Sequence, residues 1–246
     1  MKVVKQVVHS VDGKGIMMGR PAYTDDLSSP DALIIKILRS PYAFAKIKSI
    51  NIEEANKVDG VELILTYKNV PRNSFTRAGQ GYPEPSPHDK FVLDEYVRYV
   101  GDEVACVAAK DLITAEKALS LIKVEYEVLE PVLDFEQAKD HSSIIHPEDG
   151  IKEMFPIGFD PKRNLAASYH MHIKDVDESF KSCDVIVEET FYTQAQAHTM
   201  MEPHTANARL DYQNRLVIYS ATQTPFHVRR ILSQTLEIPL SKIRII

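Results

Sequence analysis

One segment, residues 103–128, limits the folds open to this chain more than any other, because it reads as strand, helix and strand in succession. The run VACVAA at 104–109 is short and apolar, as in a largely buried strand. Asp111 is a good N-cap for the helix that follows, whose apolar residues repeat at spacings of three, four and three: Leu112, Ala115, Leu119 and Ile122. Residues 123–128, KVEYEV, then alternate polar with apolar, which predicts a second strand.

The rest of the chain also mixes short strands with short helices, which predicts an α+β fold. Further strands are predicted at 33–38, 61–65, 184–194, 206–212, 215–221 and 242–246, the fourth and fifth of these forming a hairpin. A short capped helix is predicted at 175–183. A longer helix follows Thr224 as N-cap and Pro225 in its first turn, with an inward stripe of Val228, Ile231, Leu232, Thr235 and Leu236.

Two stretches follow neither the helical nor the strand period. Residues 71–89 hold four of the 14 prolines and two of the nine glycines, and a loop this long is usually functional, a partner contact, or mobile. Residues 146–164 are the best candidate for a linker, so we predict domains at 1–145 and 165–246. Because a globular domain rarely ends within an apolar strand, we expect the second domain to continue beyond Ile246.

Charge and cysteine content exclude several classes of function. The chain has 29 Lys+Arg against 35 Asp+Glu, a formal charge of −6, which argues against nucleic acid or an anionic membrane as the main partner. Its two cysteines exclude a disulfide framework, a cysteine zinc site and an iron–sulfur cluster of its own. We see neither a signal peptide nor a run of about 18 apolar residues, and we expect a cytoplasmic protein.

The commonest cofactor motifs do not fit this chain. Gly79-Gln80-Gly81 lacks the third glycine and the following helix of a dinucleotide fingerprint. His170 and His172 would share one face of a strand and can in principle bind a metal. With no third ligand nearby, we favour a solvent-facing position for both.

The segment HTMMEPH brings His198, Glu202 and His204 together within seven residues. A metal site at His198 and Glu202 would need a helix, and Pro203 biases Glu202 away from helical geometry. Two interpretations stay open: a loop whose polar side chains bond the backbone, or a loop that shapes a binding site.

Gln223 lies between the predicted strand 215–221 and the helix after Thr224, a position where ligands often bind in mixed folds. Its amide can donate and accept, and the adjacent helix start offers free N–H groups. The simpler interpretation is a turn cap, which the residues taken alone favour.

Six segments of this sequence resemble one known family: 19–27 (GRPAYTDDL), 38–47 (LRSPYAFAKI), 59–71 (DGVELILTYKNVP), 99–134, 198–208 (HTMMEPHTANA) and 220–245. The first four are similar to the α/β-hammerhead domain of the molybdenum-binding subunit of the xanthine dehydrogenase and aldehyde oxidase family. The last two are similar to the start of that family's molybdenum cofactor domain. The resemblance therefore implies a hammerhead domain followed by part of an α+β molybdopterin-binding domain.

The departures from the family pattern are modest. The family often has His at the position of Phe44, Asp at that of Asn69, and Glu-Pro at Asp102-Glu103. These positions bear on packing. The larger departure is that the family's glycine-rich cofactor loop and its general-base glutamate follow the segment like 242–246, and neither is in this sequence.

The resemblance implies a hydroxylase that oxidises a carbon of an N-heterocycle or aldehyde with water as the oxygen source. The cofactor would be molybdopterin or its cytosine dinucleotide form. Gln223 matches the family glutamine that hydrogen-bonds the molybdenum oxo ligand, and Thr222, Glu202 and His204 would keep that part of the pocket in shape. No residue matches a catalytic base or a protein ligand to the metal.

The resemblance also implies partners: an iron–sulfur subunit and an FAD subunit, a small-molecule substrate, and a complex that forms homo-oligomers. These 246 residues alone are expected to be inactive. The alternative is a scaffold or subunit-interaction module that binds no cofactor.

Overall fold

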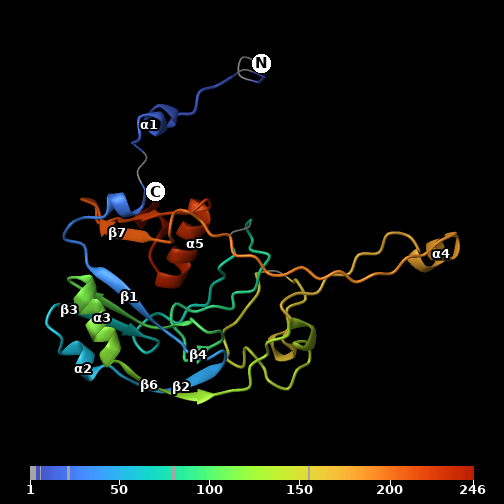
Figure 1. Cartoon of the computed structure of the whole chain (residues 1–246), viewed down its shortest axis with the longest axis horizontal. Helices are drawn as coiled ribbons and strands as arrows, with labels where there is room; N and C mark the ends of the chain where they lie inside the picture. The colour runs from blue at the N-terminus through green and yellow to red at the C-terminus, as the bar shows by residue number, and fades with distance from the viewer. Residues whose placement is uncertain (1–3, 6, 21–22, 79–80, 155) are drawn as a thin grey trace.

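The structure is a computed structural model that describes residues 4–5, 7–20, 23–78, 81–154 and 156–246. Strands β1 (Ile34–Arg39), β5 (Glu103–Ala109) and β3 (Val61–Thr66) form an antiparallel sheet in the order β1-β5-β3. The central strand β5 is lined by small and branched side chains. Helices α2 (Glu53–Asn56) and α3 (Leu112–Leu121) cover one face of the sheet (Figure 1).

Alanines allow the close approach of α3 to this sheet. Ala115 and Ala118 on the helix and Ala105 and Ala109 on β5 are fully buried in one apolar cluster. Because a protein interior is close-packed, larger side chains at these positions would force the two layers apart. The apolar spacing predicted for this helix therefore faces the core.

The predicted N-cap of α3 is confirmed, since the Oδ1 atom of Asp111 accepts a hydrogen bond from the backbone N–H of Thr114 at 2.7 Å. Strand β6 (Lys123–Val128) begins one residue after the C-cap, as predicted. It joins a different sheet from β5, however, in the order β4-β2-β6 with β4 (Tyr96–Val97) and β2 (Ala45–Asn51). The unit 103–128 thus connects the two sheets of the first domain.

A third sheet in the order β7-β8-β9 lies at the other end of the body (Figure 1). The predicted hairpin is confirmed as antiparallel β7 (Ala206–Leu210) and β8 (Leu216–Ser220). Strand β9 (Ile243–Ile245) runs parallel to β8 and occupies an edge of the sheet. Helix α5 (Pro225–Leu236) packs against β9.

The sequence predicted the start of α5 correctly but not the hydrogen bonding of its N-cap residue. Thr224 occupies the N-cap position, yet its side chain makes no capping hydrogen bond. Its backbone N–H instead donates to Oγ1 of Thr222 at 3.1 Å. The residues predicted to face inward are buried or half-buried. His227, which was not among them, is only 7% exposed.

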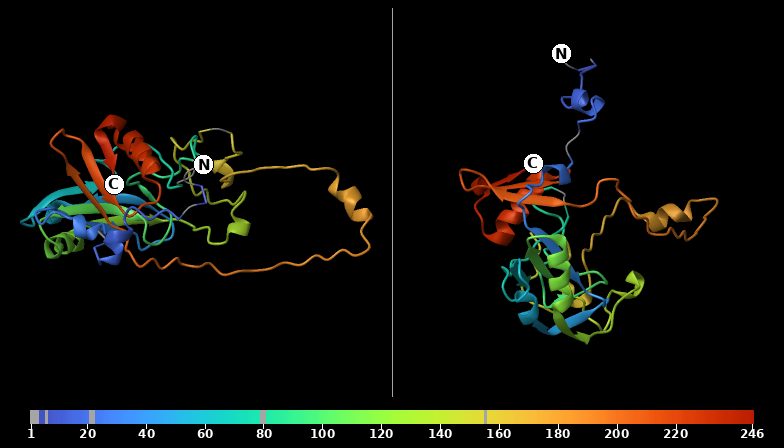
Figure 2. Two further views of the ribbon diagram at one scale, coloured as in Figure 1. Left: turned by 90° about the horizontal axis from the view of Figure 1, so that it is seen from above. Right: turned by 60° about the vertical axis from the view of Figure 1, so that its left-hand side comes forward.

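The strand predicted at 184–194 is wrong. These residues are exposed and belong to an arm, residues 166–201, that projects far from the body (Figures 1 and 2). The alternating pattern is present, but no strand among the described residues pairs with it, and a strand needs a hydrogen-bonded neighbour. The short helix of the arm, α4 (Val176–Lys181), is confirmed, with Asp175 as its N-cap.

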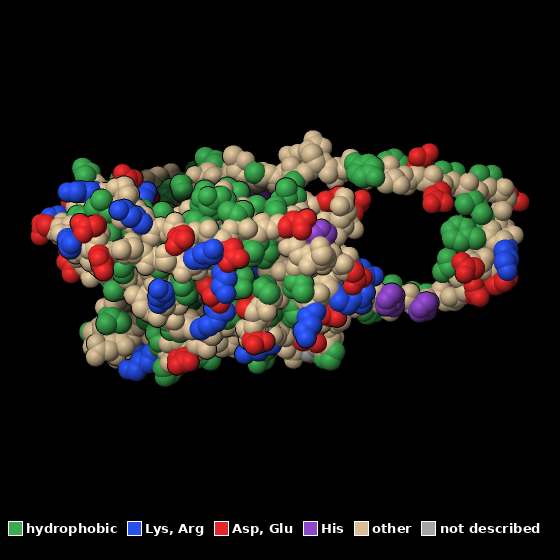
Figure 3. Space-filling view, turned by 90° about the horizontal axis from the view of Figure 1, so that it is seen from below, with side chains coloured by type: hydrophobic (Ala, Val, Ile, Leu, Met, Phe, Trp, Pro, Cys, Tyr) green, Lys and Arg blue, Asp and Glu red, His purple; other side chains and the backbone are tan. Residues whose placement is uncertain are grey.

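Apolar side chains are exposed along the arm, as the space-filling view shows (Figure 3). Val185, Val187 and Phe191 are 77%, 79% and 87% exposed.

The remaining short elements are α1 (Gly13–Met17) and four 3-10 turns: η1 (Asp25–Leu27), η2 (Phe135–Gln137), η3 (Pro161–Arg163) and η4 (Leu240–Lys242). Within the described ranges, no helix combines the length and the apolar character that crossing a membrane requires.

The two segments without periodicity pack on each other and on the first domain. Ser74 Oγ donates to the carbonyl of Gly150 at 2.8 Å, and the N–H of His88 donates to the carbonyl of Lys152 at 2.7 Å. The segment 146–164 is therefore fixed along the first domain. The domain boundaries at 145 and 165 stay a prediction.

A buried ionic network holds these segments in place. Arg98, whose side chain is 9% exposed, pairs with Asp94 at 2.9 Å and with Glu148, and the two carboxylates are 3% and 4% exposed. Arg72 also reaches Asp94, at 2.8 Å. Because each buried charge has a partner of opposite sign, the network tolerates its burial.

Removing Arg98 should destabilise the fold strongly. Arg98→Met leaves Asp94 and Glu148 without their main partner in the interior, which costs about 3–5 kcal/mol of unfolding free energy. The matched variant Arg163→Met loses only an exposed pair with Asp140 and should leave stability nearly unchanged. Chemical denaturation of both variants measures the difference, and equal stabilities would contradict the role given to Arg98.

Candidate functional site

The four residues predicted to lie at a site line one open cavity of about 1140 Å³. Thr222 and Gln223 come from the turn between β8 and α5, and Glu202 and His204 from the segment before β7. The remaining lining residues come from η1 and its N-cap, from the loop 71–89, from the arm, from β8 and the turn after it, and from the last residue: Thr24, Leu27, Arg77, Met200, Tyr219, Ser220, Ala221, Thr224 and Ile246. Both predicted domains therefore contribute walls.

Gln223 is exposed on this cavity. The turn around it is fixed by other groups: the N–H of Thr222 donates to the carbonyl of Ser220 at 2.8 Å, and Thr222 Oγ1 accepts from Thr224. A turn cap would need a hydrogen bond from the Gln223 side chain, and it makes none with the part of the chain that the structure describes. Its amide is thus open to solvent in the cavity.

Glu202 holds a wall of the cavity. Its Oε1 atom accepts a hydrogen bond from the N–H of Thr24 at 3.1 Å, and the side chain of Asn207 donates to the carbonyl of Thr24 at 3.0 Å. Thr24 is only 6% exposed. The loop that carries Glu202 is not helical, as Pro203 predicted, and its carboxylate both bonds the backbone and shapes the cavity.

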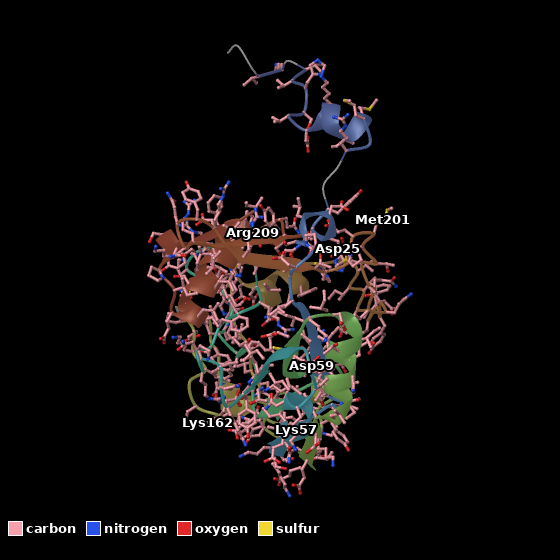
Figure 4. All side chains as sticks on the ribbon, turned by 90° about the vertical axis from the view of Figure 1, so that its left-hand side faces the viewer. Asp25, Lys57, Asp59, Lys162, Met201 and Arg209 are labelled. Carbon is pink, nitrogen blue, oxygen red and sulfur yellow. The ribbon has the colours of Figure 1, made fainter. Side chains whose placement is uncertain are left out.

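A smaller cavity of about 250 Å³ also has Glu202 in its lining. Asp25 and Met201, both labelled in Figure 4, line it together with Tyr23 and Pro203. Glu202 therefore lies between the two cavities and contributes to both.

The histidines and the glycine motif considered above do not join the site. His170, His172 and His198 are exposed on the arm, outside the residues that line the large cavity. The described residues contain no cluster of three or more His, Cys, Asp or Glu side chains able to hold a metal. Of Gly79-Gln80-Gly81, the first two lie outside the described residues.

Arg77 is a lining residue that the sequence did not reveal. Its guanidinium donates to the hydroxyl of Tyr99 at 3.0 Å and to Glu103 at 2.8 Å. These two contacts fix the guanidinium, and with it a positive charge, in the part of the lining that the first domain contributes. The one available signal was the length of the loop 71–89, which indicates function without naming a residue.

Glu103, which anchors Arg77, has an unusually low pKa. Burial alone would raise it, but the charge and hydrogen bond of Lys90, at 3.1 Å, and then the charge of Arg77 lower the pKa to about 2. Glu103 is therefore ionised at any physiological pH, which keeps the guanidinium of Arg77 paired.

Two family models match this chain in succession. One, described as the aldehyde oxidase and xanthine dehydrogenase a/b hammerhead domain, matches residues 18–130, and one described as a molybdopterin cofactor-binding domain matches residues 159–246. The chain belongs to the xanthine dehydrogenase and aldehyde oxidase family. The two sheets of the first half are its hammerhead domain, and the cavity is bounded on one side by its cofactor-binding region.

Relatives agree with this assignment. The chain is 34% identical over 270 residues to the probable hypoxanthine oxidase XdhD of Escherichia coli O157:H7, covering 100% of this chain and 28% of the relative. It is 32% identical over 238 residues to the nicotinate dehydrogenase large molybdopterin subunit of Eubacterium barkeri, covering 96% and 51%. The chain thus spans between about a quarter and half of the length of these relatives.

Solved structures share the fold. Quinoline 2-oxidoreductase from Pseudomonas putida 86 superposes with a TM-score of 0.71 at 26% identity, over 97% of this chain and 29% of that one. The aldehyde oxidoreductase from Desulfovibrio gigas gives a TM-score of 0.77 at 24% identity, over 96% and 26%. The predicted α+β fold, a hammerhead domain followed by part of a molybdopterin-binding domain, is confirmed.

The low pKa of Glu103 predicts how acid affects stability. A carboxylate whose pKa is depressed on folding stabilises the protein above its unfolded pKa, near 4.5, and this contribution is lost as the pH falls toward 2. Glu103→Gln should remove about 1–2 kcal/mol at pH 7 after solvent screening, and much less at pH 3. Denaturation at both pH values measures this, with exposed Glu116→Gln as the control. A loss that is the same at both pH values would contradict the assignment.

Proposed function

We propose that this chain is part of a molybdenum-dependent hydroxylase, an oxidoreductase acting on a carbon of an N-heterocycle or aldehyde. The family assignment supports the class of chemistry. The names of the relatives above, a probable hypoxanthine oxidase and a nicotinate dehydrogenase, support an N-heterocycle. The single observation that carries the proposal is the free amide of Gln223 on an open cavity that residues of both domains line.

The residues of this cavity fit a polar, anionic cofactor. Its volume of about 1140 Å³ is slightly above that of ordinary ligand sites, and its wall offers the amide of Gln223, the hydroxyl of Thr222, the imidazole of His204 and the guanidinium of Arg77 beside the carboxylate of Glu202. The molybdenum cofactor, when bound, supplies the two-electron oxidation.

Each residue has a distinct task in this proposal. The Gln223 amide would donate a hydrogen bond to the cofactor when it is bound, and such a fixed dipole would stabilise developing negative charge. Thr222 fixes the turn that carries Gln223, through the hydrogen bond from Thr224. Glu202 holds the wall at Thr24, and His204 lies on the same wall. No residue here is assigned the role of general base, so we propose that residues 1–246 alone do not turn over substrate.

We further infer that electrons leave through an iron–sulfur subunit and an FAD subunit of the same complex. The two cysteines support this, because Cys106 is half-buried in β5 and Cys183 is exposed on the arm, too few to hold a cluster. The relative from Eubacterium barkeri is itself described as a large molybdopterin subunit. The cofactor would be molybdopterin or its cytosine dinucleotide form.

One observation favours the alternative, an interaction module without cofactor. The arm 166–201 exposes a series of apolar side chains that no other described segment covers. Large exposed apolar surfaces mark interaction sites. The molybdenum content of the protein, expressed from its own gene and isolated with the subunits that co-purify, separates the two functions: the hydroxylase retains the metal and the module does not.

Changing Gln223→Ala in that isolated protein should lower turnover by roughly two orders of magnitude, since losing one donor to developing charge costs about 3 kcal/mol. Stability should hardly change, because the side chain is exposed and makes no hydrogen bond in the described structure. Steady-state rates, normalised to molybdenum content, measure the effect.

The matched control is Gln234→Ala, which removes an exposed amide from α5 itself and should leave the rate unchanged. If Gln223→Ala stays within about twofold of the parent rate, the cavity residue has no part in the reaction and the proposal loses its main support.

A further inference from the structure

A buried carboxylate of the first domain holds the helix next to Gln223. Glu84 lies in the loop 71–89 and is only 2% exposed. Its Oε1 atom accepts a hydrogen bond from Arg230 Nη2 at 2.8 Å and lies 2.9 Å from His227 Nδ1. Both partners belong to α5, more than 140 residues further along the chain.

Further contacts of the same loop fix the rest of the helix. The Asn73 side chain donates to the carbonyl of Thr235 at 3.2 Å and to the carboxylate of Glu237 at 3.0 Å, at the far end of α5. The Arg230 guanidinium also lies over the ring of Tyr82, 5.3 Å from its centre. The loop therefore contacts α5 near both of its ends. The buried carboxylate of Glu84 lies near the end that is closer to the cavity.

Because Glu84 is charged and buried, its contact with His227 and Arg230 requires a defined geometry. Burial alone would raise the pKa of Glu84, but the hydrogen bonds from Arg230 and His227 and their charges hold it below the ordinary value, so the carboxylate is ionised near pH 7. A buried carboxylate that loses its partners is costly. The helix is thus stabilised in this position, where Glu84 reaches both side chains.

Position along α5 connects this contact to the cavity. Helix α5 begins at Pro225, so His227 lies in its first turn, and Gln223 precedes the helix by two residues. On the other side the turn is tied to β8, whose Ser220 N–H donates to the carbonyl of Ile246 at 3.1 Å. Only Thr224 separates Gln223 from the first residue of α5, so a displacement of the helix also displaces the turn that carries Gln223.

We propose that Glu84 is a positioning residue for Gln223: it fixes α5 against the first domain and thereby sets where the Gln223 amide lies in the cavity. The catalytic consequence rests on the proposed function, while the geometric claim concerns the chain alone. Nothing in Glu84 itself reaches the cavity, whose lining does not include it.

The first test measures backbone mobility in the protein isolated with its co-purifying subunits. In Glu84→Ala, amide hydrogen exchange should rise about tenfold or more in residues 220–230 and stay unchanged in β5 and α3. Exchange that rises equally in both regions, or in neither, would show that Glu84 contributes only to general stability or to nothing, and either result overturns the proposal.

The second test separates positioning from stability by a double variant. Glu84→Ala should lower kcat per molybdenum about tenfold to hundredfold with little change in KM. The double variant Glu84→Ala/Gln223→Ala should be no slower than Gln223→Ala alone, because Glu84 acts through Gln223. Losses that multiply would contradict the proposal.

Two further variants keep the result interpretable. Glu84→Gln retains the size and one acceptor for Arg230, should give a smaller effect, and carries both tests if Glu84→Ala does not accumulate. Glu116→Ala removes an exposed carboxylate from α3 and should match the parent. If Gln223→Ala has no effect on the rate, the proposed function fails, whereas the exchange experiment still decides whether Glu84 positions the turn.

Discussion

The contact of Glu84 with His227 and Arg230 is the interaction on which the functional geometry of this chain depends. It is a charged contact between a loop of the hammerhead domain and a helix of the cofactor-binding region, in which Glu84 and His227 are buried and Arg230 is half-buried. The cavity has walls from both regions, Arg77 and Thr24 from one and Gln223 and Glu202 from the other. Its shape is therefore set by how the two regions dock.

Charged and polar contacts fix two segments that pack on the first domain, and one of them, the loop 71–89, contributes Arg77 to the cavity. The loop 71–89 and the segment 146–164 have no periodic apolar face, and they are held by buried ion pairs and backbone hydrogen bonds instead, Arg98 with Glu148 among them. Such pairs demand defined geometry, since each charge must meet its partner or pay the cost of desolvation. The described parts of these two stretches, which hold little regular secondary structure, are thereby fixed in place.

Local signals made most of the fold predictable. The cap at Asp111, the alternation at 123–128 and the hairpin 206–221 each act within a few residues, and the structure contains all three. The pattern at 184–194 was equally clear but failed, because a strand also requires a neighbour and none is described beside it. The sequence pattern shows which face a segment offers, not whether another segment covers it.

The candidate site was predictable only in part. Gln223, Thr222, Glu202 and His204 were found through position and resemblance, and they line one cavity. Glu84, His227 and Arg77 were missed, because their partners lie far away in the chain or across a domain contact that no local pattern encodes.

The most direct test of the proposed cofactor site is a structure of the complete, molybdenum-loaded protein. Our account predicts cofactor in this cavity with the Gln223 amide within about 3.5 Å of its metal end; cofactor bound elsewhere, or Gln223 turned back onto the backbone, would contradict it.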